Sequence, residues 1–125
     1  MDMEKKKILI IEDEQDVVRL LAARLTHSGF ETVIAADGVQ GVQFTHKEKP
    51  DLIILDLMLP AGDGLSVLEN LRLSAYSRYI PVVILTGVKD EEYKNKVIQK
   101  GVEAYFEKPY NPDELINLIK DILKV

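Results

Sequence analysis

Acids, a hydroxyl and an amine stand directly after short apolar runs of this chain. Acids that fold into one place repel one another, which raises their pKa values or lowers stability unless a cation offsets the charge. The ligand atoms on offer are oxygens, which favour Mg²⁺, or Mn²⁺ in its place, over zinc or copper. An aspartate can also be the nucleophile of phosphoryl transfer. The residues concerned are Glu12, Asp13, Asp56, Thr86 and Lys108.

Phosphoryl transfer would give these groups different tasks. The Asp56 carboxylate would attack, and the charge on the transferred phosphoryl oxygens would need to be neutralised. Mg²⁺, the Lys108 ammonium group and the Thr86 hydroxyl are suited to that task. Gly87 has no side chain and would leave the approach to Asp56 open.

Each of these residues also has an ordinary structural explanation. An acid after a buried strand, such as Asp56, is most often a helix cap or loop residue. The acids at 12–14 would be favoured at a helix start by the helix dipole, and alone that reading is as good as a metal site. It is their coincidence after four different apolar runs that favours a common site.

Five apolar runs alternate with five longer amphipathic segments, which predicts strands alternating with helices. Continuously apolar runs indicate strands covered by helices on both faces. Gly29 predicts a helix stop, and Asn111 followed by Pro112 predicts a helix start. The expected strands are 8–11, 31–35, 52–55, 81–85 and 104–106, and the expected helices are 16–28, 37–47, 65–73, 90–100 and 112–123.

This alternation predicts an α/β fold with a parallel five-stranded sheet and right-handed crossovers. We expect a flavodoxin-like (βα)5 three-layer sandwich with strand order 2-1-3-4-5. In that order the first and third strands adjoin, and ligands bind beyond the carboxyl ends of the strands at that point. The reactive residues after the strands would therefore share one pocket.

The bulk composition narrows the function further. The 125 residues fit one domain, 1–125, with a core of about 6–124. The absence of cysteine excludes disulfides and thiol chemistry, and the net charge of −5 argues weakly against nucleic acid as a direct partner. No apolar run approaches the roughly 20 residues that span a bilayer. We expect a cytoplasmic protein with no membrane partner.

These residues resemble those of the response regulator receiver family, the CheY-like superfamily, over about residues 6–124. The family's first strand ends in an acidic pair, as at Glu12 and Asp13. Its phosphoacceptor lies in a stretch like 51–60, with glycines following at 62 and 64. A Ser or Thr ends the fourth strand and a Lys-Pro pair follows the fifth, here Thr86 and Lys108-Pro109; the combination is highly specific.

The resemblance implies a metal site and a nucleophile. Asp56 would take the phosphoryl group. Asp13 would bind Mg²⁺ directly, Glu12 would do so through water, and the Met58 backbone carbonyl would be a further ligand.

The resemblance also implies a switch. Thr86 and Lys108 would contact the phosphoryl group, and the aromatic Tyr105 would fill the space that Thr86 leaves when it moves inward. The face near the fourth helix, fifth strand and fifth helix would then change shape for a partner. The Lys108–Pro109 peptide bond would be cis, as is common in the family.

The implied partners are a sensor histidine kinase or phosphotransfer protein and a downstream effector, or an output domain that lies outside this chain. We expect a monomer or a weak phosphorylation-dependent dimer, because Leu118 stands where the transcription-factor subfamily usually has Arg. Met58 and Val88 occupy the positions that tune dephosphorylation, and neither can orient an attacking water. This predicts a long-lived phosphoryl group.

Two other functions compete. A Mg²⁺-dependent phosphatase of the haloacid dehalogenase type also uses an Asp nucleophile, but it needs a second Asp two residues on, where this chain has Met58. A pseudo-receiver or flavodoxin-like binding module would need no phosphorylation, and the intact Asp13, Asp56 and Lys108 argue against it. His27 and His46 are interpreted as solvated or packing residues.

Overall fold

The apolar runs form the five parallel strands of one sheet in the order β2-β1-β3-β4-β5. A computed structural model describes residues 4–60 and 63–125; Gly62, expected in a turn-rich loop, lies outside the described residues. The flavodoxin-like topology predicted from the sequence is therefore confirmed. The strands are β1 (Lys7–Ile11), β2 (Glu31–Ala35), β3 (Leu52–Leu55), β4 (Val82–Thr86) and β5 (Ala104–Glu107).

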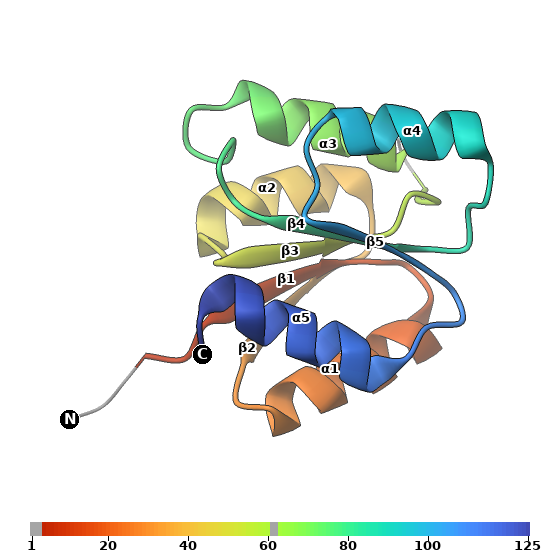
Figure 1. The fold of residues 1–125 in the computed structure, drawn as a ribbon. Helices are drawn as coiled ribbons and strands as arrows, with labels where there is room; N and C mark the ends of the chain where they lie inside the picture. Colours follow the sequence, from red (N-terminus) through yellow and green to blue (C-terminus); the bar gives the residue numbers. More distant parts are fainter. Residues whose placement is uncertain (1–3, 61–62) are drawn as a thin grey trace.

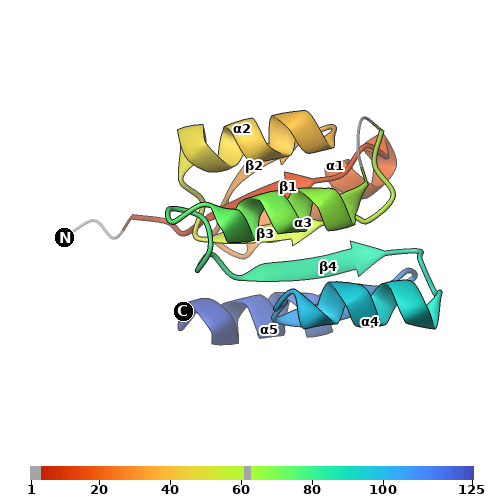
Figure 2. The ribbon, with the colours of Figure 1, turned by 90° about the horizontal axis from the view of Figure 1, so that it is seen from above.

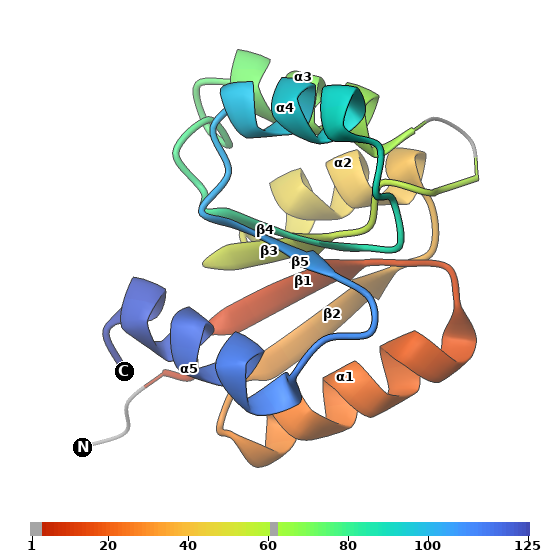
Figure 3. The ribbon, with the colours of Figure 1, turned by 45° about the vertical axis from the view of Figure 1, so that its right-hand side comes forward.

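Helices cover both faces of the sheet and give the three layers visible in Figure 1. Helices α1 and α5 lie on one face, and α2, α3 and α4 lie on the other. Seen from above, α2, α3 and α4 cross their face in that order (Figure 2), while β5 runs between α4 on one face and α5 on the other (Figure 3). The helices are α1 (Gln15–His27), α2 (Gly38–Glu48), α3 (Gly64–Leu73), α4 (Glu91–Gln99) and α5 (Pro112–Leu123).

Successive side chains of the buried strands enter two separate cores. Ile8 and Ile10 of β1 pack toward α1 and α5, whereas Leu9 and Ile11 pack toward α2, α3 and α4. All four are fully buried. Burying one such side chain contributes about 1.5–3 kcal/mol, so both apolar faces of the central strands hold the sheet in register. That register fixes which residues meet at the carboxyl edge.

Local signals set the helix ends. Gly29 has φ +96°, a left-handed conformation that a residue with a side chain rarely adopts, and it follows α1 as predicted. The Asn111 side chain accepts hydrogen bonds from the backbone N–H groups of Asp113 and Glu114, which confirms it as the N-cap of α5.

The observed boundaries differ from the predicted ones by a residue at several ends. Thr86 is the last residue of β4 rather than the first after it, because it pairs in register with Glu107 of β5. Strand pairing thus continues one residue beyond the apolar run. None of the helices among the described residues has the length and apolar character needed to cross a bilayer.

Candidate functional site

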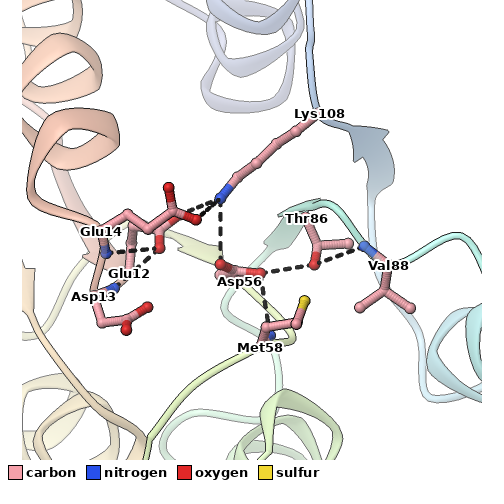
Figure 4. A network of polar contacts seen from close by, with 8 residues as sticks. All are labelled: Glu12, Asp13, Glu14, Asp56, Met58, Thr86, Val88 and Lys108. Carbon is pink, nitrogen blue, oxygen red and sulfur yellow. Dashed lines mark hydrogen bonds and ion pairs between the residues drawn. The ribbon is translucent and has the colours of Figure 1, made fainter.

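Backbone pairing brings the predicted reactive residues together at the carboxyl edge of the sheet (Figure 4). The Asp56 N–H donates to the Ile11 carbonyl at 3.0 Å, which places Asp56 beside Glu12. The Lys108 N–H donates to the Thr86 carbonyl at 2.8 Å, which places these two residues side by side. Four strands therefore supply one site.

Asp56 is buried, with 3 % of its surface exposed, and both carboxylate oxygens accept hydrogen bonds. Its Oδ1 accepts from the Thr86 hydroxyl at 2.7 Å and from the Met58 backbone N–H at 3.1 Å. Its Oδ2 lies 3.3 Å from Lys108 Nζ. These contacts hold the carboxylate in one orientation and face it with donors on two sides.

Lys108 is the cation that faces the carboxylates of this site among the described residues. Its Nζ lies 2.7 Å from Glu12 Oε1, 3.3 Å from Asp56 Oδ2 and 3.7 Å from Glu14 Oε1. Burial alone would lower the pKa of Lys108, but its hydrogen bond to Glu12 and the negative charges of Asp56 and Glu12 outweigh burial and raise it. The amine therefore stays charged at neutral pH. The Lys108–Pro109 peptide bond is cis.

Glu12 is the acid whose ionisation the fold disfavours most clearly. Burial raises its pKa to about 7, and the charge of Asp56 adds to this, although the hydrogen bond from Lys108 opposes it. Its Oε2 accepts the backbone N–H groups of Asp13 and Glu14 at 3.0 and 3.1 Å. Burial therefore favours the neutral form of Glu12, and a cation bound nearby would favour its charged form.

The acids fit a divalent cation. One carboxylate oxygen from each of Glu12, Asp13 and Asp56 lies within 4.8 Å of the others. Lys108 supplies one positive charge, which Glu12 and Asp56 already share with Glu14, so a bound cation would offset the negative charge that remains. An all-oxygen donor set of this kind suits a hard ion such as Mg²⁺ or Mn²⁺.

A chain of hydrogen bonds connects Asp56 to the edge strand β5. The Thr86 Oγ1 that donates to Asp56 also accepts from the Val88 N–H at 3.3 Å, and the Tyr105 hydroxyl donates to the Val88 carbonyl at 2.8 Å. Burial, together with the charge of Glu107, raises the pKa of Tyr105 to about 12, so this phenol remains a donor. The ammonium group of Lys94 lies 5.0 Å from the centre of the Tyr105 ring.

Two glycines shape the site differently. A Cβ on Gly87 would meet no atom within 4 Å, as expected for an open approach to Asp56. A Cβ on Gly64 would lie 2.5 Å from the Leu57 Cα and 2.8 Å from the Asp56 carbonyl oxygen. Gly64 therefore allows the start of α3 to pack directly on the backbone that carries Asp56.

Sequence reasoning missed three features of this region. It did not foresee that Glu14 pairs with Lys108, that Lys94 covers Tyr105, or that Gly64 packs on the loop. Only Gly64 carried a signal, because a glycine at a helix start can indicate close packing. His46 stacks on Tyr76 with ring centres 5.8 Å apart, away from the acids.

The family model described as response regulator receiver domain matches residues 8–120. The chain belongs to this family. The receiver is 39 % identical over 120 residues, 95 % of its length and 49 % of the relative's, to the alkaline phosphatase synthesis transcriptional regulatory protein PhoP of Bacillus subtilis. A CheY-like receiver domain protein of Methanospirillum hungatei has a TM-score of 0.91 at 28 % identity, covering 97 % of this chain and 95 % of that one.

A second solved structure bears on the metal. The Mn²⁺-bound form of response regulator Rcp1 has a TM-score of 0.80 at 32 % identity, covering 94 % of this receiver and 91 % of that chain. The receiver spans about half the length of the curated relatives it matches. Because the B. subtilis relative is named a transcriptional regulatory protein, the expectation that nucleic acid is not a direct partner is not supported. The net charge of one receiver does not describe a longer protein.

Proposed function

We propose that this receiver accepts a phosphoryl group on Asp56 and passes the signal on through a change of shape. The observation that carries the proposal is the position of Asp56. It is buried against the Thr86 hydroxyl, the Lys108 amine and the carboxylates of Glu12 and Asp13, where β1, β3, β4 and β5 end. These are the groups that phosphoryl transfer to an aspartate requires.

The donor is a phosphohistidine of a sensor histidine kinase or phosphotransfer protein, or a small acyl phosphate. An Asp56 oxygen forms a bond to phosphorus while the donor's own bond to phosphorus breaks. From phosphohistidine the P–N bond breaks and the departing imidazole takes up a proton; from an acyl phosphate the P–O bond breaks and a carboxylate leaves. Thr86 Oγ1 and Lys108 Nζ lie 2.7 and 3.3 Å from the Asp56 oxygens, within reach of a group attached there. Both can donate hydrogen bonds to the transferred oxygens.

Glu12, Asp13 and Asp56, with the Met58 backbone carbonyl, would hold Mg²⁺. When bound, the ion neutralises charge on the phosphoryl oxygens. Mn²⁺ would serve in its place. Met58 itself presents an exposed thioether and no second carboxylate, so the acid/base that a haloacid dehalogenase phosphatase needs is missing at this position.

The signal would leave the site through Thr86. When its hydroxyl turns to the phosphoryl oxygens, the hydrogen bond from the Val88 N–H changes, and Val88 is tied to Tyr105. The loop before α4 and the edge strand β5 would move together. An effector protein, or another domain of a longer protein, would bind the surface that this movement changes.

Incubation with acetyl phosphate and Mg²⁺, followed by intact mass measurement, tests the proposal. Wild-type protein should gain one phosphoryl mass, and D56N should gain none. D51N is a matched control, because Asp51 precedes the opposite end of β3, where its carboxylate accepts from the Lys7 N–H at 2.7 Å. A phosphatase would instead release phosphate over many turnovers, and a binding module would remain unlabelled; either result would overturn the proposal.

A further inference from the structure

Of the five helices in the described part of the chain, α1 alone begins without a side-chain cap. In the other four, the side chain of the residue before the helix accepts a backbone N–H of the first turn. Glu14 holds that position in α1 and makes no such bond, and Glu is not among the residues that helix starts prefer. The four capping residues are Asp37, Asp63, Asp90 and Asn111.

The Glu14 carboxylate turns instead to the amine of Lys108, as Figure 4 shows. Its Oε1 lies 3.7 Å from Nζ, and its backbone N–H donates to Glu12 Oε2 at 3.1 Å, which fixes the main chain beside the site. The Glu14 side chain is 64 % exposed, whereas those of Glu12 and Asp56 are 4 % exposed. Glu14 is therefore the outer of the three carboxylates around Lys108.

The three carboxylates pull the ammonium group in opposing directions. Glu12 and Asp56 draw it inward, where attraction is stronger because water is excluded, and Glu14 draws it toward solvent. Without Glu14, both remaining carboxylates would be buried ones. The amine would then settle more firmly between Glu12 and Asp56, and Asp56 is the carboxylate that has to attack.

We propose that Glu14 is a positioning residue for phosphoryl transfer, which holds Lys108 Nζ at the mouth of the site where it meets the incoming phosphoryl group. This inference rests on the proposed phosphorylation of Asp56. It also explains why α1 lacks the side-chain cap that every other described helix has. The longer side chain of Glu14 brings its carboxylate to Lys108 and not to the N–H groups of the helix.

Two substitutions of Glu14 distinguish the effect of its charge from the effect of its side-chain length. E14Q keeps the length of the side chain and removes its charge. E14D keeps the charge, is one methylene shorter, and can cap α1. The matched control is E48Q, because Glu48 pairs with Lys7 at 3.3 Å at the opposite end of the sheet. Each protein is phosphorylated by acetyl phosphate over a range of donor concentrations at saturating Mg²⁺, and its thermal midpoint is measured in EDTA.

We expect E14Q and E14D each to lower the maximal phosphorylation rate, by about two- to fivefold, the size typical of a largely exposed ion pair. E48Q should leave the rate unchanged. E14D should at the same time raise the thermal midpoint in EDTA, because Asp caps a helix better than Glu. An E14D variant that is slower but more stable than wild type would show that Glu14 acts on Lys108 and not on the stability of α1.

Three results would overturn the inference. A slower E14Q with an E14D equal to wild type would show that a negative charge before α1 is enough, so that contact of Glu14 with Lys108 does not position the amine. A faster E14Q with an unchanged E14D would mean that Glu14 merely repels the anionic donor, and equal rates for all variants would give it no role. If wild-type protein is not labelled at all, the proposed function fails first, which is a separate result.

Discussion

The Thr86 hydroxyl lies 2.7 Å from Asp56 Oδ1 and donates its hydrogen to that oxygen. The same Oγ1 accepts the Val88 N–H at 3.3 Å, so the hydroxyl is oriented from both sides. Thr86 is fully buried, and no water is needed to satisfy it. The expectation that phosphorylation moves Thr86 stays a prediction, and in this structure its hydroxyl already faces the carboxylate of Asp56.

T86A should slow phosphorylation of Asp56 by about tenfold, because a hydrogen bond to a charged group is worth about 1.5–3 kcal/mol and part of it develops during transfer. T86S keeps the hydroxyl and should stay within about twofold of wild type. The measurement is the rate of mass gain with acetyl phosphate. Equal rates for T86A and wild type would show that this hydroxyl does not assist transfer.

Replacing Lys108 should increase the affinity for Mg²⁺ and decrease the rate of phosphorylation. K108M removes the ammonium group that Glu12 and Asp56 share at 2.7 and 3.3 Å, so their charge becomes available to a cation. Mg²⁺ should bind more tightly, by about tenfold, since one buried charge interaction is worth on the order of 1.4 kcal/mol or more. Phosphorylation should nevertheless slow, because the phosphoryl oxygens lose a donor.

Isothermal titration with Mg²⁺ and the acetyl phosphate assay, run on the same K108M preparation, check both effects. K7M is the matched control, because Lys7 pairs with Glu48 at the far end of the sheet. Weaker Mg²⁺ binding in K108M would contradict the competition between amine and cation.

Alanine substitutions of Gly64 and Gly87 should affect the free energy of unfolding differently. G64A places a methyl group 2.5 Å from the Leu57 Cα, so the start of α3 has to shift, at a cost of about 1–3 kcal/mol. G87A adds a methyl group to open space and should leave the free energy of unfolding unchanged. Urea unfolding of both variants measures this, and comparable stabilities would mean that α3 adapts without strain.

The strands and their order could be predicted because three central strands are apolar on both faces, a pattern typical of a parallel sheet between helix layers, and because they alternate with amphipathic segments. The same topology brings the ends of β1, β3, β4 and β5 to one edge, so Glu12, Asp56 and Lys108 could be assigned to a common site before their distances were known. Strand ends were less predictable, because the pairing of Thr86 with Glu107 depends on register and not on hydrophobicity.

The contacts that sequence reasoning missed depend on the reach of long side chains. From the sequence, Glu14 is interpreted as an acid at a helix start. Nothing in the sequence shows that its carboxylate turns to Lys108, 94 positions along the chain. The sequence likewise does not indicate the role of Lys94 in α4, which lies over Tyr105 and 3.8 Å from Glu107. The first pair depends on how the start of α1 lies beside the end of β5, and the Lys94 contacts depend on how α4 lies beside β5. A single sequence does not encode either arrangement locally.

Met58 should govern how long the phosphoryl group lasts. Its side chain is 64 % exposed two residues after Asp56, and a thioether cannot orient a water for attack on phosphorus. M58N offers an amide that can do so and should shorten the phosphoryl lifetime by about tenfold, less than the roughly 10²–10⁴-fold that a positioned acid or base contributes. M58L, which stays apolar, should match wild type.

Phosphate release from purified, labelled protein in Mg²⁺ measures the lifetime for all three forms. The backbone N–H at position 58, which donates to Asp56 Oδ1 in this structure, is present in every variant, so the substitutions change the side chain alone. A wild-type lifetime of seconds would contradict the prediction, because water would then be oriented by some group other than the residue at this position. The amide of M58N would in that case add little to the rate.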